Sequence, residues 1–273
     1  MEIRVILTSL DVDLEPPRIL TCTVDLARRF NARIIGMAAA APPTAAAGFA
    51  SAFAVAAGYA RARIEIEARL ANLRNEFHAA VPQSLMLEWH SLIESPTAAL
   101  LGACQQADLI VTTTRDGDAS SLRSVDVGAL IVAAGRPVLA VGADASSADF
   151  KTIVVGWKQT REARRAVMDA LPLLRLADEV VVATVSEGNE TEERASLEKV
   201  VTWLDRHGIK ARSEVVFASV QGAGASLENI ARIVGADLVV AGAYGQSRIR
   251  EWLLGGMTKE LLQAKTINRF FSN

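Results

Sequence analysis

A strand-then-helix alternation runs along all 273 residues and begins again near the middle of the chain. The first series of expected strands, each rich in apolar and β-branched residues, covers 3–7, 32–38, 84–92, 108–114 and 136–142. The second series covers 151–157, 179–185, 210–218, 237–243 and 266–272. Helical patterns separate the strands, which predicts parallel sheets with helices on both faces.

The doubling is also visible in short matching stretches. "ADLIV" at 107–111 and "ADLVV" at 236–240 lie 129 positions apart. Between the two series, "ADASSAD" at 143–149 is small and polar, which is typical of a linker. We therefore expect two similar domains, at 1–143 and 150–273. In such sheets ligands bind at the carboxyl ends of the strands, where the strand order reverses.

Charge and cysteine usage exclude several classes of protein. The formal net charge is -2, and we expect no nucleic-acid partner because such partners require a strongly basic face. Cys22 and Cys104 are the only cysteines and form no CxxC motif. This argues against a disulfide framework or a zinc site and fits a reducing cytoplasm. We interpret His78, His90 and His207, which are isolated in the sequence, as surface or core residues rather than metal ligands.

No segment has the pattern of a targeting signal or a membrane span. The opening "MEIRVILTSLD" carries an acidic residue at position 2 and only a short apolar run. The alanine-rich segment 36–60 is interrupted by Pro42-Pro43, whereas a span needs about 20 mostly apolar residues without a break. We interpret it as a loop that leads into a helix with a broad buried face. The alternative is an apolar contact surface for a partner.

Four glycines lie at the end of the strand 237–243 and in the segment after it. Gly242 and Gly245 come first, and nine residues separate Gly245 from the pair Gly255-Gly256. Glycine adopts main-chain angles that other residues resist and lets a ligand approach the main chain closely. We expect a helix to begin at the glycine pair, and N–H groups at a helix start favour anions. The loop, with Ser247 as the cap of its turn, is therefore predicted to cradle phosphates.

The spacing Gly-x2-Gly-x9-Gly resembles the nucleotide-binding signature of the universal stress protein family. "GAYGQSRIREWLLGGMT" has the three glycines in register, and "RVILTSLD" at 4–11 is similar to the family's first strand, which ends in Asp. The resemblance implies two five-stranded parallel α/β domains, Rossmann-like and similar to adenine nucleotide alpha hydrolases, packed as a pseudo-dimer. It also implies that the last strands, 136–142 and 266–272, meet and cover each other's edges.

The resemblance further implies that the C-terminal domain binds ATP, with or without Mg²⁺. The phosphates would lie against the main-chain N–H groups of Gly242, Gly245 and Gly255–Met257, and adenine against the main chain of Ala183–Val185. The complete set of implied binding residues is Gly242, Gly245, Gln246, Ser247, Arg248, Gly255, Gly256, Met257, Thr258, Gly156, Trp157, Lys158 and Val185. Arg248 is either a solvated charge or a phosphate contact.

Two positions depart from the family pattern, and the role of the neighbouring Trp157 stays open. Gly256 stands where the family has a small hydroxyl residue, and one lost side-chain bond to phosphate costs about 1–2 kcal/mol. Lys158 stands where the first strand of the second half should end in an acid. A contact of an acid with ribose or metal is therefore not expected here. The lysine can instead pair with phosphate. Trp157 either packs in the core or stacks on a base.

The first half lacks the glycines. At the offset of 129, Gly242 corresponds to Thr113, Gly245 to Asp116, Gly255 to Asp126, Gly256 to Val127 and Thr258 to Ala129. Two carboxylates would repel a phosphate, because like charges ~4 Å apart cost ~4 kcal/mol at an effective dielectric constant near 20. We expect no ATP in the N-terminal half and interpret it as the built-in partner of the C-terminal half. Its aspartates are interpreted as surface residues rather than a cation site.

Three functions are compatible with these features. The first is a cytoplasmic stress-response protein that binds an adenine nucleotide and acts as a regulatory or docking module. The second is a tandem scaffold that binds no nucleotide and acts by dimerising or by docking to an unknown protein. The third is a weak ATPase, although no catalytic residue can be assigned because no general base is evident. Homodimer formation beyond the internal pair stays open, as does the choice among ATP, ADP, AMP and a cyclic nucleotide.

Overall fold

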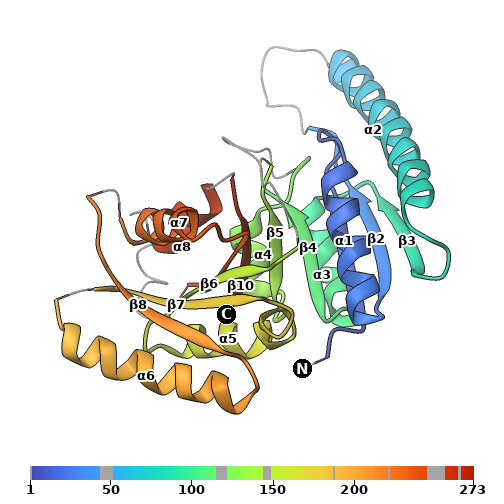
Figure 1. Cartoon of the computed structure of the whole chain (residues 1–273). Coiled ribbons are helices and arrows are strands. Elements are labelled where there is room, and N and C mark those ends of the chain that lie inside the picture. The colour runs from blue at the N-terminus through green and yellow to red at the C-terminus, as the bar shows by residue number, and fades with distance from the viewer. Residues whose placement is uncertain are drawn as a thin grey trace. The chain divides into compact units, whose positions relative to one another are not determined.

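The computed structural model describes residues 2–43, 52–114, 122–143, 149–186, 188–220, 222–244, 256–263 and 266–273. The chain forms two compact units, Ile3–Leu130 and a second that consists mainly of Ile131–Asn273. Each unit contains a mostly parallel sheet with helices packed on it (Figure 1). The α/β fold with a doubled element order is therefore as the sequence predicts.

The N-terminal unit has the strand order β3-β2-β1-β4, and the described pairs β1–β2, β2–β3 and β1–β4 are all parallel. Its elements are β1 (Val5–Leu10), α1 (Pro17–Phe30), β2 (Arg33–Ala39), α2 (Ala52–Ala80), β3 (Met86–Leu92), α3 (Pro96–Ala103), η1 (Cys104–Gln106), β4 (Leu109–Thr113) and the start of α4 (Val127–Ala133). Helix α1 begins at Pro17, whose fixed φ suits a first turn, and ends at Asn31 with a left-handed φ of 51°.

The C-terminal unit has the strand order β5-β10-β9-β6-β7-β8. Its elements are β5 (Val138–Val141), β6 (Thr152–Gly156), α5 (Arg161–Leu174), β7 (Glu179–Ser186), α6 (Glu190–Arg206), β8 (Ala211–Phe217), α7 (Ala223–Ile233), β9 (Leu238–Gly242), α8 (Met257–Gln263) and β10 (Asn268–Ser272). All described pairs are parallel except β5–β10, which is antiparallel. The meeting of the two last strands is thus confirmed.

The junction of β5 and β10 is the centre of the C-terminal core. Phe270 pairs with Leu139 and Phe271 with Val138, and all four side chains are buried. Arg269, opposite Ala140, is also fully buried, and this burial lowers the pKa of its guanidinium to about 10, although the charge of Glu228 raises it. Because β5 closes an edge that β10 would otherwise expose, the pairing protects both strands from unwanted association.

The repeated "ADL" motif has the same structural role in both halves. Asp108 accepts hydrogen bonds from the main-chain N–H groups of Arg4 and Val5 at 2.9 and 3.0 Å. Asp237 accepts one from Lys151 at 3.1 Å. Both carboxylates therefore hold the amino end of the first strand of their half, at the edge of the sheet opposite the carboxyl ends where we expect a ligand.

Helix α2 is the one element whose burial differs from expectation. It begins at Ala52, and no residue from Phe53 to Glu65 is buried. The expectation of a broad buried face is therefore wrong for this part, because the helix extends past the sheet of its own unit (Figure 1). Its buried residues start at Ile66 and continue with Leu70, Leu73 and Phe77. Within the described ranges, no helix is long and apolar enough to cross a membrane.

Candidate functional site

Strand β6 is the point where the strand order of the C-terminal unit reverses. It lies between β7, which follows it in the chain, and β9, with Gly156 paired to both Ala183 and Ala241. At such a point the connections that follow two neighbouring strands run to opposite faces of the sheet. This leaves a crevice at the carboxyl ends of the two strands, and ligands of open α/β sheets bind there. Gly156 and Gly242 are the last residues of β6 and β9, so both lie at this carboxyl end of the sheet.

Gly242 is required by packing against helix α5. A Cβ atom at this position would lie 2.5 Å from the main-chain nitrogen of Ala163 and 2.5 Å from the carbonyl carbon of Glu162. Real Cβ atoms do not approach main-chain atoms so closely, so only glycine lets α5 begin at this distance from β9. The first glycine of the motif therefore has a structural reason that needs no ligand.

Gly156 faces the other side of the sheet. A Cβ atom here would lie 2.8 Å from Cδ1 of Leu227 on α7. Gly156 pairs with Ala241, and consecutive strand residues point to opposite faces, so Gly156 and Gly242 face different helices. The two glycines let α7 and α5 approach the sheet from opposite sides beside the crevice.

Hydrogen bonds to neighbouring residues fix the position of Trp157. Its side chain is half-buried, and its indole N–H donates to the Ser196 hydroxyl of α6 at 2.9 Å. Its main-chain N–H donates to the carbonyl of Ala183, and its carbonyl accepts from the Thr184 hydroxyl at 2.6 Å. These bonds favour the packing interpretation of Trp157. Lys158, the next residue, is exposed at the end of the strand.

The end of β7, whose main chain is predicted to contact adenine, extends beyond the end of the neighbouring strand β6. The last β6 residue, Gly156, pairs with Ala183, whereas β7 continues to Ser186. Val185 is half-buried and is paired with Val216 of β8 on its other side. The β6-facing edge of Val185 therefore lies past the end of β6, next to the crevice.

The chain turns sharply where β9 ends. Tyr244 has a φ of 53°, which is uncommon for a residue other than glycine. The side chain of Asn273 donates to the carbonyl of Ala243 at 3.0 Å, and the Ala243 N–H donates to Ser272. Main-chain strain of this kind gathers at functional sites. Tyr244 is the last described residue before Gly245, the second glycine of the motif.

Two further groups at this edge were not predicted as site residues. Thr160 is the N-cap of α5, and its hydroxyl accepts from the Ala163 N–H at 3.2 Å. A threonine just before a helical pattern is a recognisable cap signal. Glu260 of α8 accepts from the N–H groups of Gly224 and Ala225 at 2.8 and 3.4 Å. It caps α7 from 36 residues away in the chain, and no local sequence pattern shows this contact.

The second part of the motif is described only at its end. Gly256 and Met257 are half-buried, and Thr258 is buried in the first turn of α8. The Gly256 carbonyl accepts from the N–H groups of Lys259 and Glu260 at 2.9 and 3.2 Å. Five predicted site residues lie outside the described residues, namely Gly245, Gln246, Ser247, Arg248 and Gly255.

In the N-terminal half, Asp126 caps the counterpart of α8. Its carboxylate accepts from the Ala129 N–H at 2.9 Å at the start of α4, and its own N–H donates to Thr97 at 2.9 Å. The Asp126 carboxylate therefore places a negative charge at the start of α4. In the other half, we predict that a phosphate places the negative charge at the matching helix start. This agrees with the interpretation of Asp126 as a surface residue. Asp116 lies outside the described residues.

An ion pair also joins two segments at the carboxyl end of the N-terminal sheet. Arg123, which precedes α4, donates to both carboxylate oxygens of Asp13 in the β1–α1 loop, with Nη2–Oδ1 at 2.6 Å and Nε–Oδ2 at 3.1 Å. Glu65 of α2 lies 3.6 Å from the same guanidinium. Sheet register aligns Ile6 with Ile153, because each pairs with its half's "ADL" leucine, so Asp13 corresponds to Thr160. The pair thus joins the β1–α1 loop to the segment that precedes α4.

The histidines and cysteines of the described segments lie apart from one another in the sequence. His90 is 2.8 Å from Glu88, and the rings of His207 and Trp203 lie 4.2 Å apart. Cys22 and Cys104, both in described segments, are buried and form no disulfide. In the part of the chain that the structure describes, no three His, Cys, Asp or Glu residues are grouped as a metal site requires.

Comparison with known proteins identifies the fold. No protein-family model and no curated protein sequence matches this chain. Among solved structures, a universal stress protein from Archaeoglobus fulgidus superposes with a TM-score of 0.70 and 13% identity and covers 98% of both chains. A second such protein, from Pseudomonas aeruginosa, has a TM-score of 0.59 and 17% identity and covers 99% of this chain and 93% of its own. The chain has the universal stress protein fold, with its element order present twice.

Proposed function

We propose that the chain is a member of the universal stress protein family whose C-terminal half binds an adenine nucleotide, with ATP as the first candidate. The observation that carries the proposal is the position of the glycine motif. Its first glycine, Gly242, ends β9, which pairs with β6 where the strand order reverses. Ligands of open α/β sheets bind at such a reversal.

The contrast between the two halves supports one site per chain. The N-terminal crevice contains the Asp13–Arg123 ion pair and the Asp126 cap. At the matching C-terminal positions the sequence has Thr160 and Gly255, and Lys158 replaces Asp11. The C-terminal crevice therefore favours a bound anion. In the N-terminal half the carboxylates of Asp13 and Asp126 already provide the negative charge. Lys158 and the main chain of the loop would bind phosphates, and Val185 would meet adenine.

The proposed role is regulatory rather than catalytic. Nucleotide binding would change the surface offered to a partner protein in a stress response. The tandem scaffold without nucleotide is the second candidate, and Gly242 favours it because packing alone explains that glycine. The two candidates differ in what Gly245 and Gly255 are for.

The decisive experiment measures bound nucleotide. The purified protein is denatured, released nucleotide is identified by mass spectrometry, and Mg-ATP is titrated by calorimetry. Gly245→Asp copies Asp116 of the first half and should abolish binding. Gly102→Asp is the matched control, because a side chain there meets no atom within 4 Å. A flat titration of the unaltered protein, or equal binding by the Gly245 variant, would leave the scaffold as the better explanation.

A further inference from the structure

Helix α2 carries an exposed apolar stripe. Phe53 is 84% exposed and Ile64 67% exposed. The stripe also contains four exposed alanines, so that its members are Phe53, Ala57, Ala60, Ile64, Ala68 and Ala71. Steps of three and four residues keep all six on one side of the helix, over about 27 Å at 1.5 Å per residue. Contiguous exposed apolar surface of this kind marks an interaction site, and small residues let another helix approach closely.

The charges beside the stripe are inverted about Ile64. Arg61 and Arg63 precede it, and Glu65 and Glu67 follow it. At 100° per residue, Arg63 and Glu67 flank one side of the stripe, while Arg61 and Glu65 flank the other. Within one chain, Arg63 Nε lies 2.8 Å from Glu67, and both side chains are about half exposed, at 54% and 50%.

This inversion makes the helix complementary to itself. If two copies lie antiparallel with a two-fold axis at Ile64, residues whose numbers add to 128 are level with each other. Each flank then faces the same flank of the other copy, with Arg63 near Glu67 of the second copy and Arg61 near its Glu65. Self-complementary surfaces of this kind are the hallmark of two-fold homodimers.

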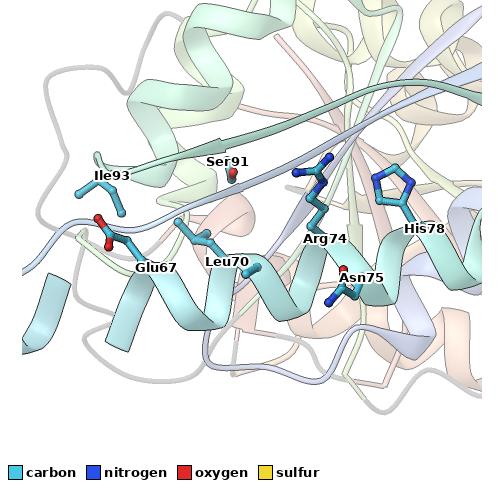
Figure 2. Close-up of a pocket in the computed structure, with 8 residues that line it drawn as sticks. Glu67, Leu70, Arg74, Asn75, His78, Ser91 and Ile93 are labelled. Carbon is cyan, nitrogen blue, oxygen red and sulfur yellow. The ribbon is translucent and has the colours of Figure 1, made fainter. Parts of the chain in front are cut away.

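The two-fold axis at Ile64 places Phe53 of the second copy beside a groove of the first copy. Phe53 becomes level with Asn75, because 53 and 75 add to 128. Figure 2 shows the groove between α2 and the strand β3, with Leu70, Arg74, Asn75 and His78 from the helix and Ile93 from the segment after β3. Its volume is about 520 Å³, which accommodates a phenyl side chain, and it lies on the Arg63–Glu67 flank.

We propose that α2 is a homodimerisation helix, in which two copies of this chain pack antiparallel about Ile64 and each Phe53 enters the other's groove. A two-fold axis at Ile64 both matches the charges on the flanks and brings Phe53 level with the groove. A second copy of the chain explains why one axis does both. A membrane surface would favour a polar face rich in Lys and Arg. The flanks of this stripe instead alternate Arg and Glu. The proposal does not depend on nucleotide binding.

Analytical ultracentrifugation of the full chain tests the proposal. The unaltered protein should sediment as a dimer, and Ile64→Asp should raise the dimer dissociation constant by about tenfold or more. Ile233→Asp is the control, because Ile233 is 65% exposed on α7 of the other unit. It should stay dimeric. Circular dichroism should be unchanged in both variants. A monomeric unaltered protein, or an Ile64 variant that dimerises normally, would overturn the proposal.

A charge exchange tests the antiparallel geometry. Arg63→Glu and Glu67→Arg should each dimerise weakly alone, because like charges then face each other across the axis. A mixture of the two variants should form a heterodimer at the strength of the unaltered protein. The pair within each helix stays broken in the mixture, so recovery reports the contact between chains. A mixture no stronger than its components would refute the arrangement.

Discussion

Gly242→Ala separates the structural role of the motif's first glycine from a ligand role. In the unliganded protein the new methyl would meet Ala163 N and Glu162 C, both at 2.5 Å. Neither atom can rotate away, because both belong to the main chain of α5. Relief therefore requires α5 to shift from β9, and the Thr160 cap bond to Ala163 at 3.2 Å would be disturbed at the same time.

The size of the effect follows from these two losses. Overpacking costs about 1–3 kcal/mol, and a weakened N-cap adds about 1 kcal/mol. We expect the free energy of unfolding to fall by about 2–4 kcal/mol, and each kcal/mol lowers Tm by about 2–4 °C in a chain of this size. The assay is thermal or urea unfolding without nucleotide, followed by circular dichroism.

The matched substitution Gly102→Ala should have the opposite sign. Gly102 is in helix α3, and a Cβ atom there meets nothing within 4 Å. Alanine is better than glycine inside a helix by about 1 kcal/mol, so this variant should be slightly more stable. If Gly242→Ala unfolds like the unaltered protein, the packing argument is wrong. A ligand role would then be the remaining reason for a glycine at 242.

Three further outcomes are expected. Gly256→Ser should tighten Mg-ATP binding about tenfold in calorimetry by restoring a hydroxyl donor, and unchanged affinity would remove Gly256 from the phosphate site. Asp126→Ala should lower the stability of the N-terminal half by about 1 kcal/mol in urea unfolding, while Asp126→Asn should lower it much less, because asparagine also caps helices; equal losses would contradict the cap. Burial raises the pKa of the Cys22 thiol from 9.0 to about 12, and the nearby Asp25 adds to this. The thiol should therefore not react with a disulfide reagent at pH 8 until the chain unfolds. Because only the unfolded chain releases this proton between pH 9 and pH 12, stability should decline as the pH rises through that range; rapid native labelling would refute the assignment.

The sequence by itself determined the doubled α/β order and the pairing of the last strands. Alternation of β-branched and helical segments is a local property, and it placed the strands within a few residues of those observed, as with 151–157 for Thr152–Gly156. The strand pattern at 237–243 likewise placed Gly242 near the end of a strand, and β9 ends at Gly242. The lack of the motif's glycines in the first half predicts that no phosphate cradle exists there.

Only the tertiary structure decided what individual residues contact. Gly242 is fixed by α5, which begins 81 residues earlier in the chain, at Arg161. The Asp13–Arg123 pair joins loops separated by 110 positions. Such contacts leave no local pattern, because they depend on which elements the folded sheet brings together. Composition alone could not decide between a buried helix and an exposed contact surface in the alanine-rich segment. Whether an apolar helix is covered depends on the length of the sheet beneath it, and α2 extends past its own sheet (Figure 1).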